Sequence, residues 1–448
     1  MLLDFLRERF QEKGGADAII CDGQSVSYSW LLTRLDEWGE FLFDHDIEAG
    51  HVTALLSEYT PEGIALFLAM IERALILVPL TPSAGPKRDQ YLSLAQTECV
   101  LRLGQGDQAV VERRAGRAEH ALYSTLRERI HPGLVLFSSG STGDSKAAVH
   151  DLTGLLNKFR TRRHDLRTLT FMQFDHIGGV DTLLYTLSNG SCVITVTDRS
   201  PESICRAVEK NRVEVLPVTP TFLNLLLLSE AYKNFDLSSL KYITYGTEVM
   251  PESTLKRCAE LFPKVTLLQK YGTTEVGTLR SKSRSSDSVW VKVGGEGYKT
   301  RIVEGLLQIK AESAMLGYLN APSPFTDDGW FITGDAVEQD GEYIRFLGRV
   351  SEIINVGGEK VFPTEVENVI QQMPDVQEVS VFSEANPLVG HIVCARVTPR
   401  GESDPHELAR RIKRFCREHL ESYKVPVKIE IVAHDQHSAR FKKMRRTT

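Results

Sequence analysis

Short apolar segments alternate with longer segments of helical spacing through the N-terminal half of the chain. Four of the short segments are rich in leucine or β-branched residues and predict strands: Val52–Leu56, Leu75–Pro79, Cys192–Val196 and Val213–Val218. The segments Pro61–Arg73 and Pro201–Asn211 carry their apolar residues at helical spacing. Strands that alternate with helices are typical of α/β proteins. We therefore expect a large N-terminal domain of layered, mostly parallel sheets.

After residue 290 the pattern changes to short strand-like pieces separated by turn residues, at 301–303, 306–309, 329–332 and 343–346. These pieces predict a small β-barrel-like subdomain over residues 290–348. The remaining segments predict a helix at 364–372, strands at 376–382 and 391–397, and a helix at 405–420. We expect residues 1–348 to form the N-terminal domain and residues 349–448 a small mobile α+β lid, with a hinge at 349–352.

Composition and charge exclude several classes of protein. The 448 residues carry a net charge of −6, which gives no general attraction to nucleic acid or anionic lipid. The longest apolar run, Ile64–Leu80, is interrupted by Glu72 and Arg73, whereas a membrane-spanning helix needs about 20 mostly apolar residues. The 7 cysteines are scattered, and the first residues lack the pattern of a signal peptide. We expect a cytoplasmic protein with no nucleic-acid partner and no membrane span.

The strongest local signal follows the apolar strand that ends at Phe137. Small or turn-forming residues run without interruption up to Asp144, and Lys146 follows: Ser138, Ser139, Gly140, Ser141, Thr142, Gly143. Such a segment brings backbone N–H groups, hydroxyls and an ammonium close to a phosphate. The spacing differs from that of a Walker A loop. The sequence predicts a phosphate-binding loop, with a flexible surface loop as the alternative.

This segment resembles the phosphate loop of the adenylate-forming superfamily, which includes acyl- and aryl-CoA synthetases, peptide-synthetase adenylation domains and luciferases. Ser145 stands where proline is usual and Ala147 where glycine is usual, but neither change removes a phosphate donor. Further segments match the family in order along almost the whole chain, most closely as in acyl- or aryl-CoA ligases. The resemblance implies the roles that follow.

Two matching segments concern the acid and the adenine. The segment 174–179 resembles the family's His-x-x-Gly segment, which implies that His176 borders the carboxylate of the acid. A lone histidine is also often a buried or helix-capping residue. The segment 245–248 resembles the glycine-rich segment that lines adenine, which gives Gly246 and Thr247 that role. Asp175 departs from the family's usual residue, and an aspartate there is able to meet an ammonium group.

Three further segments complete the implied nucleotide site. In the Tyr-Gly-x-Thr-Glu signature at 271–275, Tyr271 and Gly272 would lie against adenine, Thr274 would bind the α-phosphate or the acyl carboxylate, and Glu275 would bind Mg²⁺. The segment 330–335 resembles the Thr-Gly-Asp motif, whose aspartate, here Asp335, accepts from both ribose hydroxyls. The pair at 348–349 implies that Arg349 contacts ribose or phosphate.

The segment 348–367 resembles the hinge and lid of the ligases, with Ser351 at the hinge position itself. Gly357 and Gly358 would let a pantetheine arm pass close to the backbone and so form the thiol channel. The family's catalytic lid lysine aligns with Lys442, although Phe441 replaces the usual glycine. Lys443 is a rival for this role, and a solvated basic tail is the alternative.

The resemblance implies an AMP-forming acid–thiol ligase that uses ATP and Mg²⁺. A fatty or aromatic acid would become an acyl-adenylate with release of pyrophosphate, and the acyl group would pass to CoA or to the phosphopantetheine of an acyl carrier protein. A homodimer is compatible with the sequence. Two alternatives remain: a stand-alone amino-acid adenylation domain, and a non-catalytic nucleotide-binding protein of the same fold.

Overall fold

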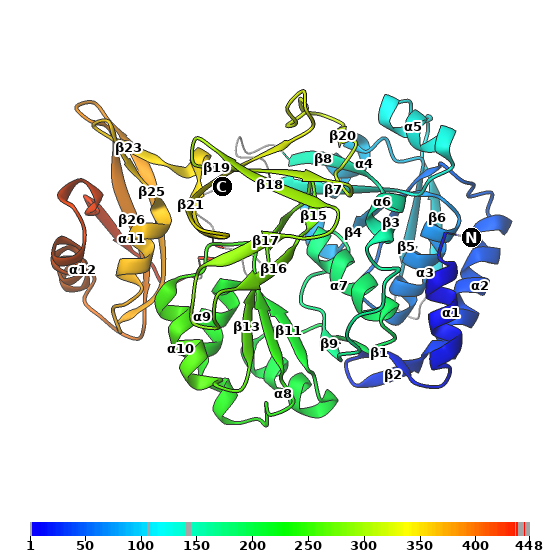
Figure 1. Ribbon diagram of the computed structural model, residues 1–448, viewed down its shortest axis with the longest axis horizontal. Coiled ribbons are helices and arrows are strands. Elements are labelled where there is room, and N and C mark those ends of the chain that lie inside the picture. Colours follow the sequence, from blue (N-terminus) through cyan, green and yellow to red (C-terminus); the bar gives the residue numbers. More distant parts are fainter. Residues whose placement is uncertain (1, 105–107, 140–144, 435, 438–442, 444–448) are drawn as a thin grey trace.

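The chain forms two large α/β layers, a β-rich subdomain and a lid (Figure 1). The computed structural model describes residues 2–104, 108–139, 145–434, 436, 437 and 443, with only the backbone at 82, 83 and 139. In Figure 1 the lid, coloured orange to red, lies at one end of the long axis and the N-terminal helices lie at the other.

The first large sheet has 7 strands, and its central strands are parallel. In sheet order they are β20 (Gly317–Tyr318), β8 (Ser145–Asp151), β7 (Gly133–Ser139), β4 (Ile76–Leu80), β3 (Val52–Leu56), β5 (Cys99–Leu103) and β6 (Ala109–Arg113). Both edges are antiparallel. Helices α4 (Arg88–Leu94), α5 (Ala121–Arg129) and α6 (Leu152–Asn157) connect or follow these strands.

The second large sheet also has 7 strands and is parallel except for its β1–β2 edge. Its order is β13 (Thr266–Gln269), β12 (Tyr242–Tyr245), β11 (Val215–Val218), β9 (Thr168–Leu169), β10 (Val193–Thr195), β1 (Asp17–Cys21) and β2 (Gln24–Ser27). Its helices are α8 (Pro201–Asn211), α9 (Pro220–Ser229) and α10 (Glu252–Leu261). The carboxyl ends of β12 and β13 therefore lie side by side, where ligands of such sheets bind.

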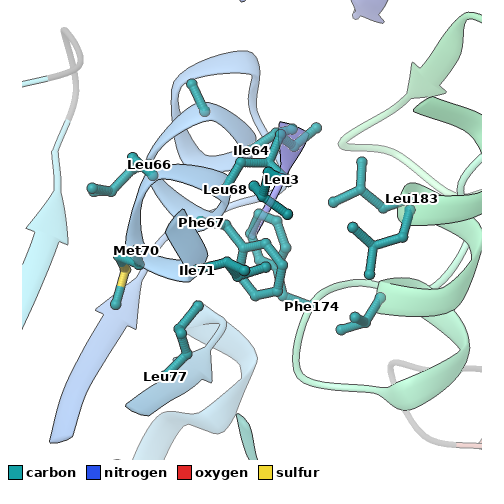
Figure 2. Packing of buried hydrophobic residues seen from close by; sticks show 14 of the residues in the cluster. Leu3, Ile64, Leu66, Phe67, Leu68, Met70, Ile71, Leu77, Phe174 and Leu183 are labelled. Carbon is teal, nitrogen blue, oxygen red and sulfur yellow. The ribbon is translucent and has the colours of Figure 1, made fainter. Parts of the chain in front are cut away.

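A central helical layer joins the two sheets. Helix α3 (Pro61–Glu72) is buried on all sides from Gly63 to Ile71, as expected for a helix without a polar face. Figure 2 shows its side chains against Phe174 and against Leu183 of α7 (Ile177–Ser188). Its other neighbours include α1 (Asp4–Lys13) and α2 (Tyr28–Asp44). The same apolar cluster includes residues of both sheets, so this layer is one continuous core.

The β-rich subdomain is a six-stranded antiparallel sheet. Its order is β16 (Arg280–Ser283), β17 (Val291–Gly294), β22 (Tyr343–Arg349), β21 (Phe331–Asp340), β19 (Leu306–Ala311) and β18 (Tyr298–Val303). The hairpin β14 (Gly272–Thr273) and β15 (Gly277–Thr278) precedes it. We expected the strand β21 to begin at Gly329, which is wrong. Gly329 has φ +80° and donates its N–H to the Thr326 carbonyl at 2.8 Å, so it forms a turn.

The lid is a five-stranded sheet with two helices, α11 (Pro363–Ile370) and α12 (Pro405–His419). Its strands are β23 (Ile354–Val356), β24 (Glu359–Val361), β25 (Val376–Asn386), β26 (Gly390–Pro399) and β27 (Lys428–Ile431). A 3-10 turn at Val350–Glu352 follows β22, at the predicted hinge. The domain boundary at 348/349 and the rotation about this turn stay predictions.

The predicted α/β fold with layered sheets is confirmed. Most of its strands and helices begin close to the expected residues because apolar segments and turn residues mark where elements start. The ends were predicted less well, since β21 continues to Asp340 and β25 to Asn386, beyond the expected 332 and 382. The 7 cysteines are all free thiols. Within the part of the chain that the structure describes, every helix is too short or too polar to cross a membrane.

Candidate active site

The strands of the predicted phosphate loop form an antiparallel pair. Ser138 at the end of β7 lies opposite Lys146 at the start of β8. Gly140, Ser141, Thr142 and Gly143 lie outside the described residues, as does the side chain of Ser139. Ser145, at the usual proline position, has its hydroxyl 3.1 Å from that of Tyr91. The departure from the family pattern thus gives the start of β8 a side-chain hydrogen bond.

A distant segment fixes the start of β8. The Asn320 amide donates to the carbonyl of Ser145 at 2.9 Å and accepts from the N–H of Ala147 at 3.0 Å. The Lys146 ammonium lies 5.3 Å from the centre of the Tyr318 ring, within range of a cation–π interaction. The segment 318–320 therefore orients Lys146 at the base of the loop.

Tyr318 also connects Lys146 to the predicted metal ligand. Its hydroxyl donates to Glu275 Oε1 at 2.6 Å. Burial and the Glu275 charge raise the pKa of Tyr318 above its ordinary value, so the hydroxyl keeps its proton. The Glu275 carbonyl accepts from the N–H of Met315 at 2.7 Å, which fixes the backbone here. One carboxylate oxygen of Glu275 is thus held by Tyr318, whose ring also lies near the Lys146 ammonium.

The predicted ribose and adenine residues form a second cluster. The Tyr271 hydroxyl donates to Asp335 Oδ2 at 2.6 Å, and Arg349 Nε lies 3.2 Å from Asp335 Oδ1. Asp335 and Arg349 are paired across β21 and β22. The ring of Tyr271 stacks on Phe346 with 4.6 Å between centroids and 14° between planes. One face of Tyr271 is therefore supported by the β-rich subdomain, and its hydroxyl is held by Asp335.

The electrostatics of Asp335 are set by burial and by Arg349. Burial raises the pKa of this carboxyl above its ordinary value, and the nearby guanidinium opposes the rise. The Asp335 side chain is 13% exposed and that of Arg349 is 51% exposed, so the arginine remains open to a solvent-borne ligand. The charge of Glu275 acts on both residues, which means that the two clusters share one region.

His150, which the sequence analysis did not single out, lies under the signature at 271–275. It is 1% exposed, on β8, against the backbone of Thr274. Burial lowers the pKa of its imidazole to about 4, so the ring is neutral near pH 7. Thr274 is half-buried above it. A neutral ring supports the Thr274–Glu275 segment without adding a positive charge beneath the nucleotide residues.

Positions 246 and 272 require glycine because a neighbouring backbone carbonyl lies close to each of them. A Cβ on Gly246 would lie 2.6 Å from the Lys270 carbonyl, and one on Gly272 would lie 2.6 Å from the Gly277 carbonyl. Thr247 has φ +73°, an uncommon conformation for a threonine. The segments at 246–247 and 271–275 follow the neighbouring strands β12 and β13, so the structure brings the predicted adenine residues together.

His176 caps helix α7. Its Nδ1 accepts from the N–H of Gly178 at 3.0 Å, so the capping role considered in the sequence analysis is present. The adjacent Asp175 is buried and its Oδ2 accepts from the Thr81 hydroxyl at 2.9 Å. A Cβ on Gly179 would lie 2.0 Å from the Gln173 carbonyl, which explains the glycine in this segment.

The lid contacts the N-terminal domain near this region. The backbone N–H of Lys443 donates to Glu248 Oε1 at 2.6 Å, and Glu248 directly follows Thr247. The Lys443 ammonium lies 3.0 Å from Glu367 Oε2, inside the lid. Lys442 lies outside the described residues. The ammonium of the rival lysine is thus occupied by a lid carboxylate in this structure.

Gly357 and Gly358 form the exposed turn between β23 and β24, with φ +61° and +98°. The Gly358 N–H donates to Asn355 Oδ1 at 2.9 Å. A Cβ at either position would meet no atom within 4 Å. The positive φ values, rather than crowding, require glycine in this arrangement of the lid.

Tyr318, Asn320 and His150 were not predicted from the sequence, because their partners lie far away along the chain and only the fold brings them together. Lys270 was not predicted either, although a lysine between the apolar strand β13 and the Tyr271 signature is visible in the sequence.

The chain is similar to known proteins along most of its length. Residues 6–303 match the AMP-binding enzyme family, and residues 365–442 match the AMP-binding enzyme C-terminal domain. The chain is 26% identical over 438 residues to the indoleacetate–CoA ligase of Aromatoleum aromaticum, covering 86% of this chain and 85% of that protein. It is 27% identical over 453 residues to the long-chain-fatty-acid–CoA ligase FadD13 of Mycobacterium tuberculosis, covering 90% and 88%.

The fold is similar to that of the anthranilate CoA ligase AuaEII in complex with anthranoyl-AMP, with a TM-score of 0.81 and 18% identity over 99% of this chain and 95% of that one. The resemblance to adenylate-forming enzymes that the motifs indicated is therefore confirmed. With a family model matched over residues 6–303, the chain belongs to the AMP-binding enzyme family.

Proposed function

We propose that the protein is an AMP-forming acid–thiol ligase. It activates a carboxylic acid with ATP to an acyl-adenylate, releases pyrophosphate, and transfers the acyl group to the thiol of CoA or of a carrier-protein phosphopantetheine. The named relatives, which are CoA ligases for indoleacetate and for long-chain fatty acids, support this reaction class.

The observation that carries the proposal is the grouping of two cation–carboxylate sets. Lys146 and Glu275 meet at Tyr318, and Asp335 and Arg349 meet at Tyr271. A nucleoside triphosphate needs cations for its phosphates and a carboxylate acceptor for its ribose hydroxyls. These residues offer both within one region, beside the backbone of Gly246 and Gly272.

In the first step, the carboxylate of the acid attacks the α-phosphorus of ATP and pyrophosphate leaves with the bonding electrons. The protein contributes positioning and charge stabilisation rather than covalent chemistry. Lys146 and the backbone of the loop at 138–143 hold the phosphates, and Arg349 and Asp335 hold the ribose side. Thr274 and His176 orient the attacking carboxylate.

The donors present fit a magnesium ion bound together with ATP. Mg²⁺ prefers a few carboxylate oxygens combined with substrate phosphates and water. The Tyr318 hydroxyl holds only one oxygen of Glu275, so this carboxylate is the group that would bind the ion. When bound, the ion would neutralise phosphate charge.

The lid completes both steps. The Lys443 contact with Glu248 brings the end of the lid to the adenine segment, while the Lys443 ammonium points to Glu367. This supports Lys442 as the lysine that bridges acid and phosphate during adenylation. Rotation about residues 349–352 would then withdraw the lysine and bring Gly357 and Gly358 to the adenylate, where the thiol attacks its carbonyl carbon and AMP leaves.

The two alternative functions make different use of the same site. An amino-acid adenylation domain would need a carboxylate for the ammonium group, and the Asp175 carboxylate is buried and already bonded to Thr81. A non-catalytic nucleotide-binding protein would bind ATP without acid-dependent turnover.

The test is acid-dependent ATP–pyrophosphate exchange with the full chain, over fatty acids, aromatic acids and amino acids. We expect exchange with one of the first two classes and acyl-CoA formation when CoA is added. Replacing Asp335 by Asn should reduce exchange about 10–100-fold through loss of the charged acceptor. Asp327→Asn, at an exposed position, is the matched control. ATP binding without exchange for any acid would contradict the proposal.

A further inference from the structure

Lys270 lies beside the candidate active site, at a position that the reaction described above does not use. It directly follows β13 and precedes Tyr271, and its N–H donates to the Tyr245 carbonyl at 2.7 Å. Its Cβ would be 3.6 Å from a Cβ placed on Gly246. The side chain of Lys270 therefore leaves the backbone alongside the glycine of the adenine segment.

The ammonium of Lys270 lacks a partner within the described part of the chain, where it makes no hydrogen bond and no ion pair. Its side chain is half-buried, so solvent still reaches part of it. The surrounding protein nevertheless lowers the pKa of the ammonium by removing part of its hydration. A lysine that is enclosed but still reachable by solvent loses hydration without gaining a counter-ion. Such a group gains most from an anion that arrives with a ligand.

The neighbouring charges leave this cation uncompensated. Asp181, on α7, is the nearby acidic residue that acts on Lys270, and it is already paired with the Lys158 ammonium. Lys158 also lies 3.4 Å from the Thr278 carbonyl of β15, which fixes the pair between α7 and β15. Arg163 adds a further positive charge that acts on Lys270. The region between α7 and the end of β13 is therefore net positive.

The acid substrate would lie in this region. Helix α7 begins at its cap His176, and Gly246 and Tyr271 follow the ends of β12 and β13. An acid whose reacting carboxylate lay between His176 and Thr274 would have its remaining atoms between α7 and the end of β13. Asp181 lies further along α7 from His176, and its charge reaches the Lys270 ammonium. The far end of the acid would thus meet a positively charged wall.

We propose that Lys270 is a specificity-determining residue that binds a second anionic group on the acid, so that the preferred substrates are dicarboxylic acids or acids with an equivalent anionic substituent. This inference rests on the proposed function and names its substrate class. Lys158 positions Asp181 and prevents that carboxylate from neutralising Lys270. A neutral chain or ring of the same size would leave the Lys270 ammonium enclosed without a partner.

The first measurement compares acids that differ only by the second carboxylate, adipate against hexanoate and isophthalate against benzoate. With wild-type protein we expect kcat/KM in ATP–pyrophosphate exchange to be about 10–100-fold higher for the diacid of at least one pair. A charge-assisted hydrogen bond typically changes binding by a factor of this size. Equal values, or higher values for the monoacids in both pairs, would overturn the assignment.

The second measurement replaces Lys270 by Met, which keeps the length of the side chain and removes the charge. The diacid-to-monoacid ratio should fall about 10–100-fold, mainly through KM of the diacid. Lys270→Arg keeps the charge and should retain the preference. Lys264→Met, at an exposed position before the same strand, should leave the ratio unchanged. An unchanged ratio in Lys270→Met would refute the inference.

Calorimetry with ATP alone checks that Lys270→Met has kept its fold, because the proposed contact of the Lys270 ammonium is with the acid. If Lys270→Met loses ATP binding, the diacid-to-monoacid ratio of Lys270→Arg is used instead. Loss of the diacid preference in Lys270→Arg would count against the proposal. Absence of exchange for every acid with wild-type protein would instead contradict the proposed function. Exchange with monoacids only would leave that function standing and remove this inference.

Discussion

At the scale of single residues, the candidate site depends on polar side chains that hold each other in place. Tyr318 is shared by Lys146 and Glu275, and Tyr271 connects Phe346 to Asp335. Both tyrosines stay protonated because burial raises the pKa of each hydroxyl. Each hydroxyl thus directs one carboxylate, which reduces the reorganisation needed when ATP binds.

His150 gives a prediction for the pH dependence of stability. Its folded-state pKa of about 4 lies below the ordinary 6.5, so the unfolded chain takes up a proton first as the pH falls. The free energy of unfolding should decrease between pH 6.5 and 4. His150→Gln should remove up to about 3 kcal/mol of this decrease. Urea unfolding at each pH measures it.

The matched control is His391→Gln, at an exposed position in the lid. Its unfolding profile should follow that of the wild type across the same pH range. A His150→Gln profile that also runs parallel to the wild type would show that the buried ring does not contribute to acid sensitivity.

The role of a residue was predictable from the sequence where the residue belongs to a short local motif. The spacing around Tyr271, Asp335 and Arg349 indicated the nucleotide residues, and the structure brings these three into contact. Tyr318 and His150 were not predictable, because a lone tyrosine or histidine has no local signal for a partner supplied by another strand. Such contacts depend on the register of β20 and β8.

At the scale of elements, glycines determine how closely the backbone segments approach. The strands and helices themselves followed from apolar spacing, as in α3 and α8, which begin at the predicted prolines. The exception was β21, where the sequence did not show that Gly329 closes a turn before the strand. Boundaries next to glycine were therefore the least predictable from the sequence.

Two helical glycines provide a matched pair of substitutions. Gly179→Ala in α7 would place a Cβ 2.0 Å from the Gln173 carbonyl, whereas Gly39→Ala in α2 meets no atom within 4 Å. Gly179→Ala should destabilise the protein by about 1–3 kcal/mol through overpacking. Gly39→Ala should stabilise it by about 0.5–1 kcal/mol through helix propensity.

Denaturant unfolding of both variants checks this pair, and acid-dependent exchange adds a functional readout. Gly179→Ala should also lower exchange, because the helix carries His176 at its cap. Equal stabilities for the two variants would contradict the contact at Gln173.

At the scale of the whole molecule, polar contacts join the described residues of the lid to the N-terminal domain. Glu248 accepts from the Lys443 backbone at 2.6 Å, and the Asn224 amide donates to the Gln377 carbonyl at 3.1 Å. Polar contacts of this kind are compatible with the proposed change in lid orientation. If the lid rotates as proposed, different lid residues would serve the two steps.

The two neighbouring lysines should therefore differ in effect. Lys442→Ala should reduce ATP–pyrophosphate exchange about 10²–10³-fold, as expected for loss of one charge-stabilising donor. Lys443→Ala removes one charged partner of the buried Glu367, which also accepts from the N–H of Val381, and should mainly lower the stability of the lid. Exchange assays and thermal unfolding of both variants separate these effects. A larger loss of exchange in Lys443→Ala would reverse the assignment.

The enclosed position of α3 also bears on how the N-terminal domain loses its structure. Since this helix contacts side chains from both large sheets in one apolar cluster, neither sheet can separate without exposing it to water. The amide protons of α3 should then exchange with deuterium only when the two layers open together, as one cooperative unit. The same opening would break up the candidate site, because its residues lie at the ends of β12 and β13 and on β8.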